Sequence, residues 1–176
     1  ALQYLLTRSG PMSMSPSQLG AFTRSQPELP HPNIQYHVQP LSLDAFGEPL
    51  HRFDAFTASV CNLRPTSRGT IHIRDANPAT PAAIDPNYLS TIEDRRVAVD
   101  SIRLTRRLTQ APSLAKFHPQ EMKPGATVDS DRELEIAAGD LGGDVGADVD
   151  LALVLLARIG VREVDHQLLS QARGSE

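Results

Sequence analysis

The stretch NIQYHVQP, residues 33–40, sets the expectation for the fold. Apolar residues stand at positions 34, 36 and 38, and polar residues stand at positions 35, 37 and 39. A period of two puts the two kinds of side chain on opposite faces of an extended chain, which is typical of a half-buried strand. Pro40 then ends the strand, because proline has no N–H to give to a neighbouring strand. The stretch therefore predicts a sheet with one apolar and one polar face.

Further strands are predicted on both sides of this stretch. Residues 21–23 form a short strand before it, and residues 56–63 form an apolar, partly β-branched strand after it. The loop RPTSRG at 64–69 is tight, because proline fixes φ and glycine tolerates a positive φ. Residues 70–74 follow as another strand. Two strands joined by so short a loop are most simply an antiparallel hairpin.

Two helices are predicted by the residues at their starts. Ser90 and Glu93 have the spacing of a capping box, so a helix should run from about Thr91 to Gln110. Ser130 and Glu133 repeat this box and begin a second helix, which reaches about residue 138. The buried stripe expected on the first helix consists of Val97, Ala98, Ile102, Leu104 and Leu108.

The fold class expected from these elements is α+β, with a mainly antiparallel sheet and helices packed on one side of it. The composition changes after Gly139, because the last proline is Pro124 and the last aromatic residue is Phe117. We therefore divide the chain into a domain at residues 1–141 and a divergent helical tail at residues 142–176. Glycines at 142–146 predict a joint, and apolar residues at helical spacing predict a helix over 148–160.

Composition and charge exclude several classes of protein. The 176 residues are enough for one domain with a core, and the 14 prolines argue against an all-helical bundle. A net charge of −4 does not favour nucleic acid as a partner. No apolar run approaches the roughly 20 residues of a membrane span. The single Cys61 fits a reducing, cytoplasmic location, and a chain that begins at Ala1 is expected to be cut from something longer.

The motifs of common catalytic sites are missing from the sequence. It has no G-x-G-x-x-G turn, no phosphate loop and no G-x-S-x-G elbow. Its six histidines are too scattered to predict a local metal site. Gln35 and His37 share the polar face of one strand, where they either line a substrate pocket or face solvent or a second layer.

Three other groups of residues have both a structural and a functional interpretation. The arginines at 95–107 could meet phosphate, or they form a solvated helix face with ion pairs such as Asp100–Arg103. Cys61 is either a small core residue or a nucleophile. The loop arginines at 64 and 68 either bind an anion or tie the hairpin to its neighbours.

Several segments resemble, in order and spacing, segments of the glucose–methanol–choline (GMC) oxidoreductases, especially the choline dehydrogenases. The resemblance covers about residues 1–141. The loop at 63–71 is similar to the RPxSRG hairpin of that family, and the strand at 33–37 is similar to one of its strands. The segments are YLLTRSGP (4–11), NIQYH (33–37), LRPTSRGTI (63–71), DPNYL (85–89), APSL (111–114), KPG (123–125) and SDREL (130–134).

This resemblance implies the substrate-binding domain of a flavin enzyme, with the flavin-binding domain in a separate amino-terminal part. The sheet would cover the flavin ring, and a primary alcohol would be oxidised to an aldehyde by hydride transfer to the flavin. The expected cofactor is the FAD of the complete enzyme, which this chain alone should not retain, and no metal is expected. The expected partners are a small-molecule alcohol and the flavin domain. The substrate-binding residues expected are Gln35, His37, Val60 and Asn62.

The resemblance ends where the family carries its catalytic base. The family continues into an H-P-x-G-T motif with a histidine base, whereas this chain reads GGDVGAD at 142–148. No catalytic residue is therefore assigned, and the role does not transfer to His166. A reading-frame change after Leu141, a truncated product and true divergence all fit, and the abrupt loss of proline and aromatic residues favours the first two. The alternative function is a non-catalytic remnant that serves as a binding or structural module.

Overall fold

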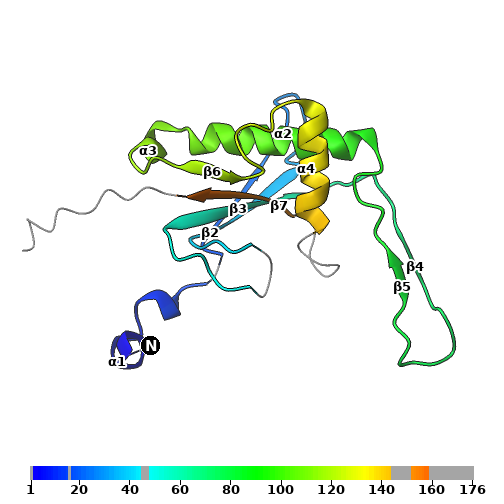
Figure 1. The fold of residues 1–176 in the computed structure, drawn as a ribbon, viewed down its shortest axis with the longest axis horizontal. Coiled ribbons are helices and arrows are strands. Elements are labelled where there is room, and N and C mark those ends of the chain that lie inside the picture. Colours follow the sequence, from blue (N-terminus) through cyan, green and yellow to red (C-terminus); the bar gives the residue numbers. More distant parts are fainter. Residues whose placement is uncertain (1, 16, 45–47, 144–151, 159–176) are drawn as a thin grey trace, which may run out of the picture.

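The computed structural model describes residues 2–15, 17–44, 48–143 and 152–158. It confirms the α+β class, with an antiparallel five-stranded sheet and helices over one face (Figure 1). The order of strands across the sheet is β1-β2-β3-β7-β6. Their bounds are β1 Leu19–Thr23, β2 Ile34–Gln39, β3 Ala55–Asn62, β6 Gln120–Lys123 and β7 Ala152–Arg158.

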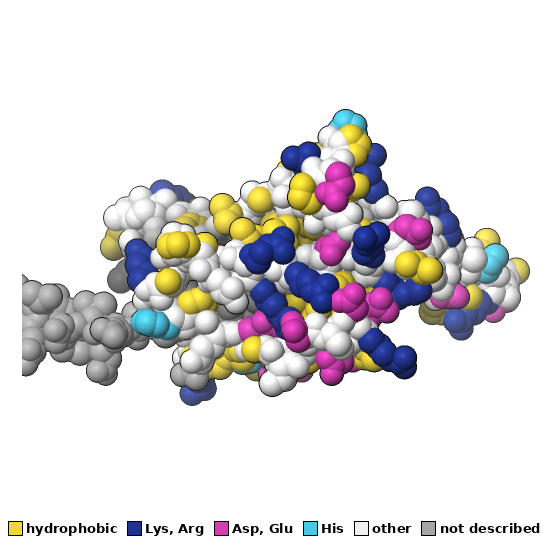
Figure 2. Space-filling view, turned by 90° about the horizontal axis from the view of Figure 1, so that it is seen from above, with side chains coloured by type: hydrophobic (Ala, Val, Ile, Leu, Met, Phe, Trp, Pro, Cys, Tyr) yellow, Lys and Arg dark blue, Asp and Glu magenta, His cyan; other side chains and the backbone are white. Residues whose placement is uncertain are grey.

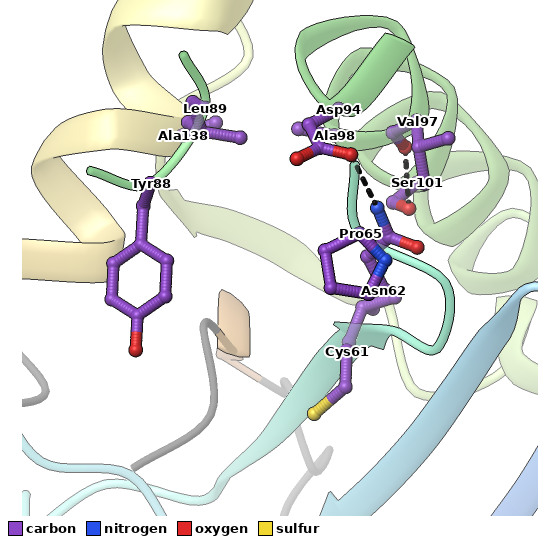
Figure 3. Close-up of a pocket in the computed structure, with 11 residues that line it drawn as sticks. Cys61, Asn62, Pro65, Tyr88, Leu89, Asp94, Val97, Ala98, Ser101 and Ala138 are labelled. Carbon is purple, nitrogen blue, oxygen red and sulfur yellow. Dashed lines mark hydrogen bonds between the residues drawn. The ribbon is translucent and has the colours of Figure 1, made fainter. Parts of the chain in front are cut away.

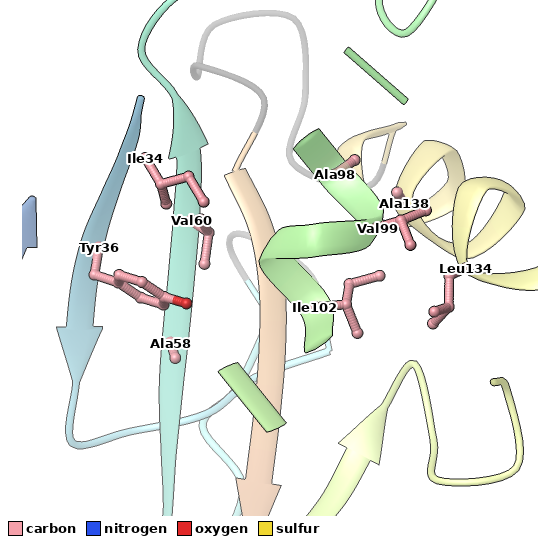
Figure 4. Packing of buried hydrophobic residues seen from close by; sticks show 9 residues of the cluster. All are labelled: Ile34, Tyr36, Ala58, Val60, Ala98, Val99, Ile102, Leu134 and Ala138. Carbon is pink, nitrogen blue, oxygen red and sulfur yellow. The ribbon is translucent and has the colours of Figure 1, made fainter. Parts of the chain in front are cut away.

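Two helices, α2 (Ile92–Thr109) and α4 (Asp131–Gly143), form the layer above the sheet. Figure 4 shows the core between the sheet and these helices, where β2 and β3 face α2 and α2 faces α4. The core residues are Ile34, Tyr36, Ala58, Val60, Ala98, Val99, Ile102, Leu134 and Ala138. The hydroxyl of Tyr36 also lies 2.8 Å from the hydroxyl of Thr105, which satisfies both groups where sheet and helix meet. The short helices α1 (Leu2–Thr7) and α3 (Pro112–Ala115) lie outside this core.

The two predicted helix starts have different outcomes. The capping box of α4 is confirmed, because Glu133 N donates to Ser130 Oγ at 3.3 Å and Ser130 N donates to Glu133 Oε2 at 3.1 Å. For α2 the predicted box was one residue early, since the cap is Thr91, whose hydroxyl accepts from Asp94 N at 3.3 Å. A hydroxyl contact of 2.6 Å between Thr66 and Thr91 holds the threonine in the capping position.

The predicted hairpin between residues 56–63 and 70–74 is wrong. β3 pairs with β2 and β7, whereas β4 (Thr70–His72) pairs with β5 (Ala83–Asp85) in a separate two-stranded arm. The connecting loop does not turn back because α2 holds it, as described below. Gly69 also lies so close to the Asp85 carbonyl oxygen that a Cβ would come within 2.2 Å of it, which commits this segment to β5.

The helix predicted over residues 148–160 is also wrong for the part that the structure describes. Ala152–Arg158 forms β7, which lies between β3 and β6. A continuous apolar run fits an inner strand as well as a buried helix, and periodicity alone does not separate the two. Residues 142 and 143 of the predicted joint belong to α4, and residues 144–146 lie outside the described part.

Three arginines of α2 form ion pairs with other elements of the fold. Figure 2 shows Lys and Arg side chains interspersed with Asp and Glu on the face seen from above. The pairs join different elements: Arg95 with Glu135, Arg103 with Asp131 and Arg106 with Glu121. The sequence predicted an Asp100–Arg103 pair, but Arg103 pairs with Asp131 of α4. Asp100 accepts a hydrogen bond from Gln26 instead. Among the described residues, no helix is both long and apolar enough to cross a membrane.

Candidate functional site

Gln35 and His37 lie on the face of the sheet turned away from α2. Their neighbours in β2, Ile34 and Tyr36, are buried in the core beneath that helix, and alternation turns Gln35 and His37 to the other side. Both are half-buried, and Gln35 Nε2 lies 2.8 Å from His37 Nε2. An amide nitrogen only donates, so the ring nitrogen accepts and a neutral His37 carries its proton on Nδ1.

The strands beside β2 add small and apolar groups to this polar pair. Cys61 lies opposite Gln35 on β3, and Ser59 lies opposite His37. On the other side Phe22 lies opposite Gln35 on β1, and 66% of it is exposed. Residues directly opposite one another share a face of the sheet. Among the described residues, this face therefore has a polar pair, Gln35 and His37, beside an exposed aromatic ring.

The other two expected substrate residues lie on the helix side of the sheet. Val60 is buried in the core, opposite Tyr36. Asn62 accepts from Arg64 N at 3.0 Å and donates to Asp94 Oδ1 at 3.2 Å, so its amide organises the start of the next loop. The structure brings Gln35 and His37 together but separates them from Val60 and Asn62 by the thickness of the sheet.

Asp94 anchors the loop that carries the RPTSRG segment. Its carboxylate accepts from Thr66 N at 2.9 Å and from Ser67 N at 2.8 Å, besides the Asn62 amide. Burial alone would raise the pKa of this carboxyl, but the hydrogen bonds from Ser67 and Thr66 hold the pKa below its usual value. The sequence patterns did not single out Asp94 for this role. Its position in the first turn, where the helix dipole favours an anion, was the available signal.

A small cavity of about 100 Å³ opens beside this anchor (Figure 3). Asn62, Pro65 and Asp94 line one side, and Tyr88 lies on the other. The walls between them are mostly apolar and come from β3, α2 and α4. Because the loop already engages both carboxylate oxygens, the cavity offers neither a free base nor a charged ligand group. We assign it a structural role.

A second polar cluster has a Ser-His-Asp arrangement but does not form a hydrolase site. Ser42 Oγ lies 2.9 Å from His51 Nδ1, and His51 Nε2 lies 3.2 Å from Asp44 Oδ2. The hydrogen bond to His51 lowers the pKa of Asp44. Ser42 is buried and the His51 ring stacks on Phe53 at 4.8 Å, so the three side chains fasten this loop. An attacking serine would need access to a substrate.

The described part of the chain provides no metal site, since it contains no group of three or more His, Cys, Asp or Glu side chains that could hold an ion. It also has no strand–glycine loop–helix unit of the kind that binds the pyrophosphate of a dinucleotide. The described residues therefore do not supply a loop of the kind that holds a dinucleotide.

Comparison with known proteins gives the family. Residues 65–141 match the family model described as GMC oxidoreductase. An alcohol dehydrogenase [acceptor] of Pseudomonas putida is 32% identical over 179 residues, covering 94% of this chain and 32% of that protein. The human mitochondrial choline dehydrogenase is 37% identical over 137 residues, covering 76% of this chain and 23% of its own length. An oxygen-dependent choline dehydrogenase of Vibrio vulnificus (strain YJ016) is 37% identical, with coverages of 76% and 24%.

The chain therefore belongs to the GMC oxidoreductase family, through the carboxy-terminal domain that residues 65–141 match. It spans only about a quarter to a third of the length of these relatives. The alignment with the Pseudomonas putida protein is too long to stop at Leu141, so similarity continues into the residues of the expected tail.

Proposed function

We propose that this chain is the substrate-binding portion of an FAD-dependent, choline-type alcohol dehydrogenase that oxidises a primary alcohol to an aldehyde. The observation that carries the proposal is the hydrogen-bonded pair Gln35–His37 on the sheet face that no described helix covers. Family membership supplies the class of reaction, and the relatives' names supply the class of substrate.

In this proposal His37 binds the hydroxyl group of the alcohol. Gln35 donates to Nε2 and fixes the neutral ring with its proton on Nδ1, so His37 acts as a hydrogen-bond donor to the alcohol oxygen. Gln35 is then a positioning residue, and the exposed ring of Phe22 covers the apolar part of the substrate. Val60 and Asn62 support the sheet from behind and do not touch the alcohol.

The redox chemistry would come from FAD held by the rest of the complete enzyme. Bound flavin supplies a hydride acceptor, and the residues of this chain cover it, orient the alcohol and keep water away. A cytoplasmic location is part of the same proposal.

A chimera tests this function. Residues 1–141 of this chain would replace the matching segment of the Pseudomonas putida relative, which keeps its own sequence beyond that point, and alcohol-dependent bleaching of the flavin band would be recorded. We expect His37→Ala and Gln35→Ala to slow bleaching at least tenfold while the flavin stays bound. His72→Ala changes an exposed histidine on the β4–β5 arm and should have no effect. Equal rates in all variants would remove Gln35 and His37 from the substrate site.

The second candidate is a non-catalytic remnant of the same domain. It is favoured by β7, which completes the sheet although the residues after Leu141 lack the H-P-x-G-T sequence of the family. This candidate would be selected if the chimera binds flavin but none of the alcohols that bleach the flavin of the unmodified relative bleaches the flavin of the chimera.

A further inference from the structure

The β4–β5 arm is a separate two-stranded ribbon that leaves the body of the molecule beside the start of α2. Its strands pair with each other and with no other described strand. In Figure 1 it extends away from the helix layer, past the level of the sheet. An isolated pair of strands is at best marginally stable in water, so this arm needs support from outside itself.

One face of the arm is apolar and exposed. Ile71 and Ile84 lie directly opposite each other, and Ile73 follows two residues after Ile71 on the same side. The exposed fractions are 67% for Ile71, 58% for Ile84 and 89% for Ile73. The opposite face carries Thr70, His72, Ala83 and Asp85. The arm is therefore amphipathic, like a pair of strands that packs one face against another part of a protein.

The root of the arm is fixed, so the apolar face has a defined direction. Gly69 lies against the carbonyl oxygens of Asp85 and Pro86, and the Asn87 side chain donates to Arg68 O at 3.0 Å. Asp94 holds the preceding loop residues on α2. These contacts fix the base of the arm and with it the orientation of the three isoleucines.

We propose that the apolar face formed by Ile71, Ile73 and Ile84 docks on the flavin-binding part of the complete enzyme. The inference rests on the proposed function, which requires such a part, and the relatives have at least two thirds of their length beyond the matched segment. The arm extends toward the side of the sheet that faces away from α2, so one partner can contact both the arm and the face that carries Gln35 and His37. The area that three isoleucine side chains can bury is well below the roughly 800 Å² per partner of a stable interface. This argues against a dimer in which two copies are joined by the arm alone.

Hydrogen exchange tests the proposal in two forms of the protein, this chain alone and the chimera described above. We expect the arm amides of residues 70–73 and 83–85 to exchange at least tenfold more slowly in the flavin-holding chimera than in the isolated chain. The double variant Ile71→Ser/Ile73→Ser should abolish this protection. The matched control His72→Ser, on the opposite face of the same arm, should retain it.

The outcomes separate the two proposals. Equal exchange of the arm in the chain and in a flavin-holding chimera would overturn the docking. Concentration-dependent protection of the isolated chain, with sedimentation as a dimer that the isoleucine variant breaks, would make a second copy the occupant and also overturn it. An arm protected in a chimera that oxidises no alcohol would leave the docking in place and remove the proposed function.

Discussion

Arg106 of α2 and Glu121 of β6 form a two-pronged ion pair, with Nε–Oε2 and Nη2–Oε1 distances of 2.9 Å each. Only 15% of the Arg106 side chain and 12% of the Glu121 side chain are exposed. Nη2 also donates to the Val128 carbonyl oxygen at 2.7 Å, so one guanidinium joins the helix, the edge strand and the loop before α4. A planar group with fixed donors suits this task better than an ammonium group does.

Arg106→Ala should therefore destabilise the protein, because it leaves the Glu121 carboxylate buried without its partner. We expect a loss of about 3 kcal/mol in the free energy of unfolding, measured by urea denaturation. Arg103→Ala is the matched control, because its pair with Asp131 is largely exposed and should contribute less than about 1 kcal/mol. Similar losses in both variants would show that burial of the Arg106 pair has no special weight.

Asp94→Asn should loosen the loop at 65–69 and with it the root of the β4–β5 arm. An amide keeps one acceptor oxygen but loses the charge that strengthens the bonds from Thr66 N and Ser67 N. We expect a loss of about 2 kcal/mol of stability and faster exchange of the Ser67 amide. An unchanged exchange rate at Ser67 would contradict the anchoring role.

The same carboxylate makes part of the stability dependent on pH. Its pKa in the folded state lies below the ordinary value of 3.8, so its contribution is fully present above that value. The contribution is lost as pH falls through the lower, folded-state pKa. The difference in stability between the wild type and Asp94→Asn should therefore shrink as the pH is lowered below about 4. A difference that stays constant down to pH 2 would rule out this linkage.

The position of the α2 cap predicts a contrast between two neighbouring residues. Thr91→Ala removes the hydroxyl that accepts from Asp94 N and should cost about 1 kcal/mol. Ser90→Ala should change stability by less than about 0.5 kcal/mol, because Ser90 is not the cap. Thermal unfolding of the two variants measures both effects, and the reverse order would restore the capping box predicted from the sequence.

Local patterns were sufficient to predict several elements. The alternation at residues 34–39 predicted the strand. It also predicted that Gln35 and His37 lie on one face of the sheet and Tyr36 on the other. The box at Ser130 and Glu133 gave the start of α4. In each case the signal lies within a few residues, and the tertiary contacts agree with it.

Distant contacts decided the elements that the sequence did not predict. The loop after β3 does not form a hairpin because Asp94, from the following helix, takes the backbone N–H groups of Thr66 and Ser67. The run at Ala152–Arg158 becomes a strand because β3 and β6 leave room for one between them. Strand register, which sets Ser59 and Cys61 beside His37 and Gln35, is likewise not visible in one strand alone.

The Gln35–His37 contact gives a prediction about a single proton. Nitrogen NMR of the wild type should show that the neutral His37 ring carries its proton on Nδ1, because Nε2 accepts from the Gln35 amide. In Gln35→Ala the proton should redistribute toward Nε2, whereas His72, which is exposed on the arm, should keep its spectrum. A wild-type His37 that carries its proton on Nε2 would show the opposite amide orientation and remove the proposed donor role.

The most direct test of the whole account is the visible absorption spectrum of the purified chain after incubation with FAD and dialysis. In our proposal this chain carries the substrate surface and the rest of the complete enzyme carries the flavin-binding site, so we expect that no flavin band remains. A stoichiometric flavin band after dialysis would contradict it, because a dinucleotide site would then lie within these 176 residues.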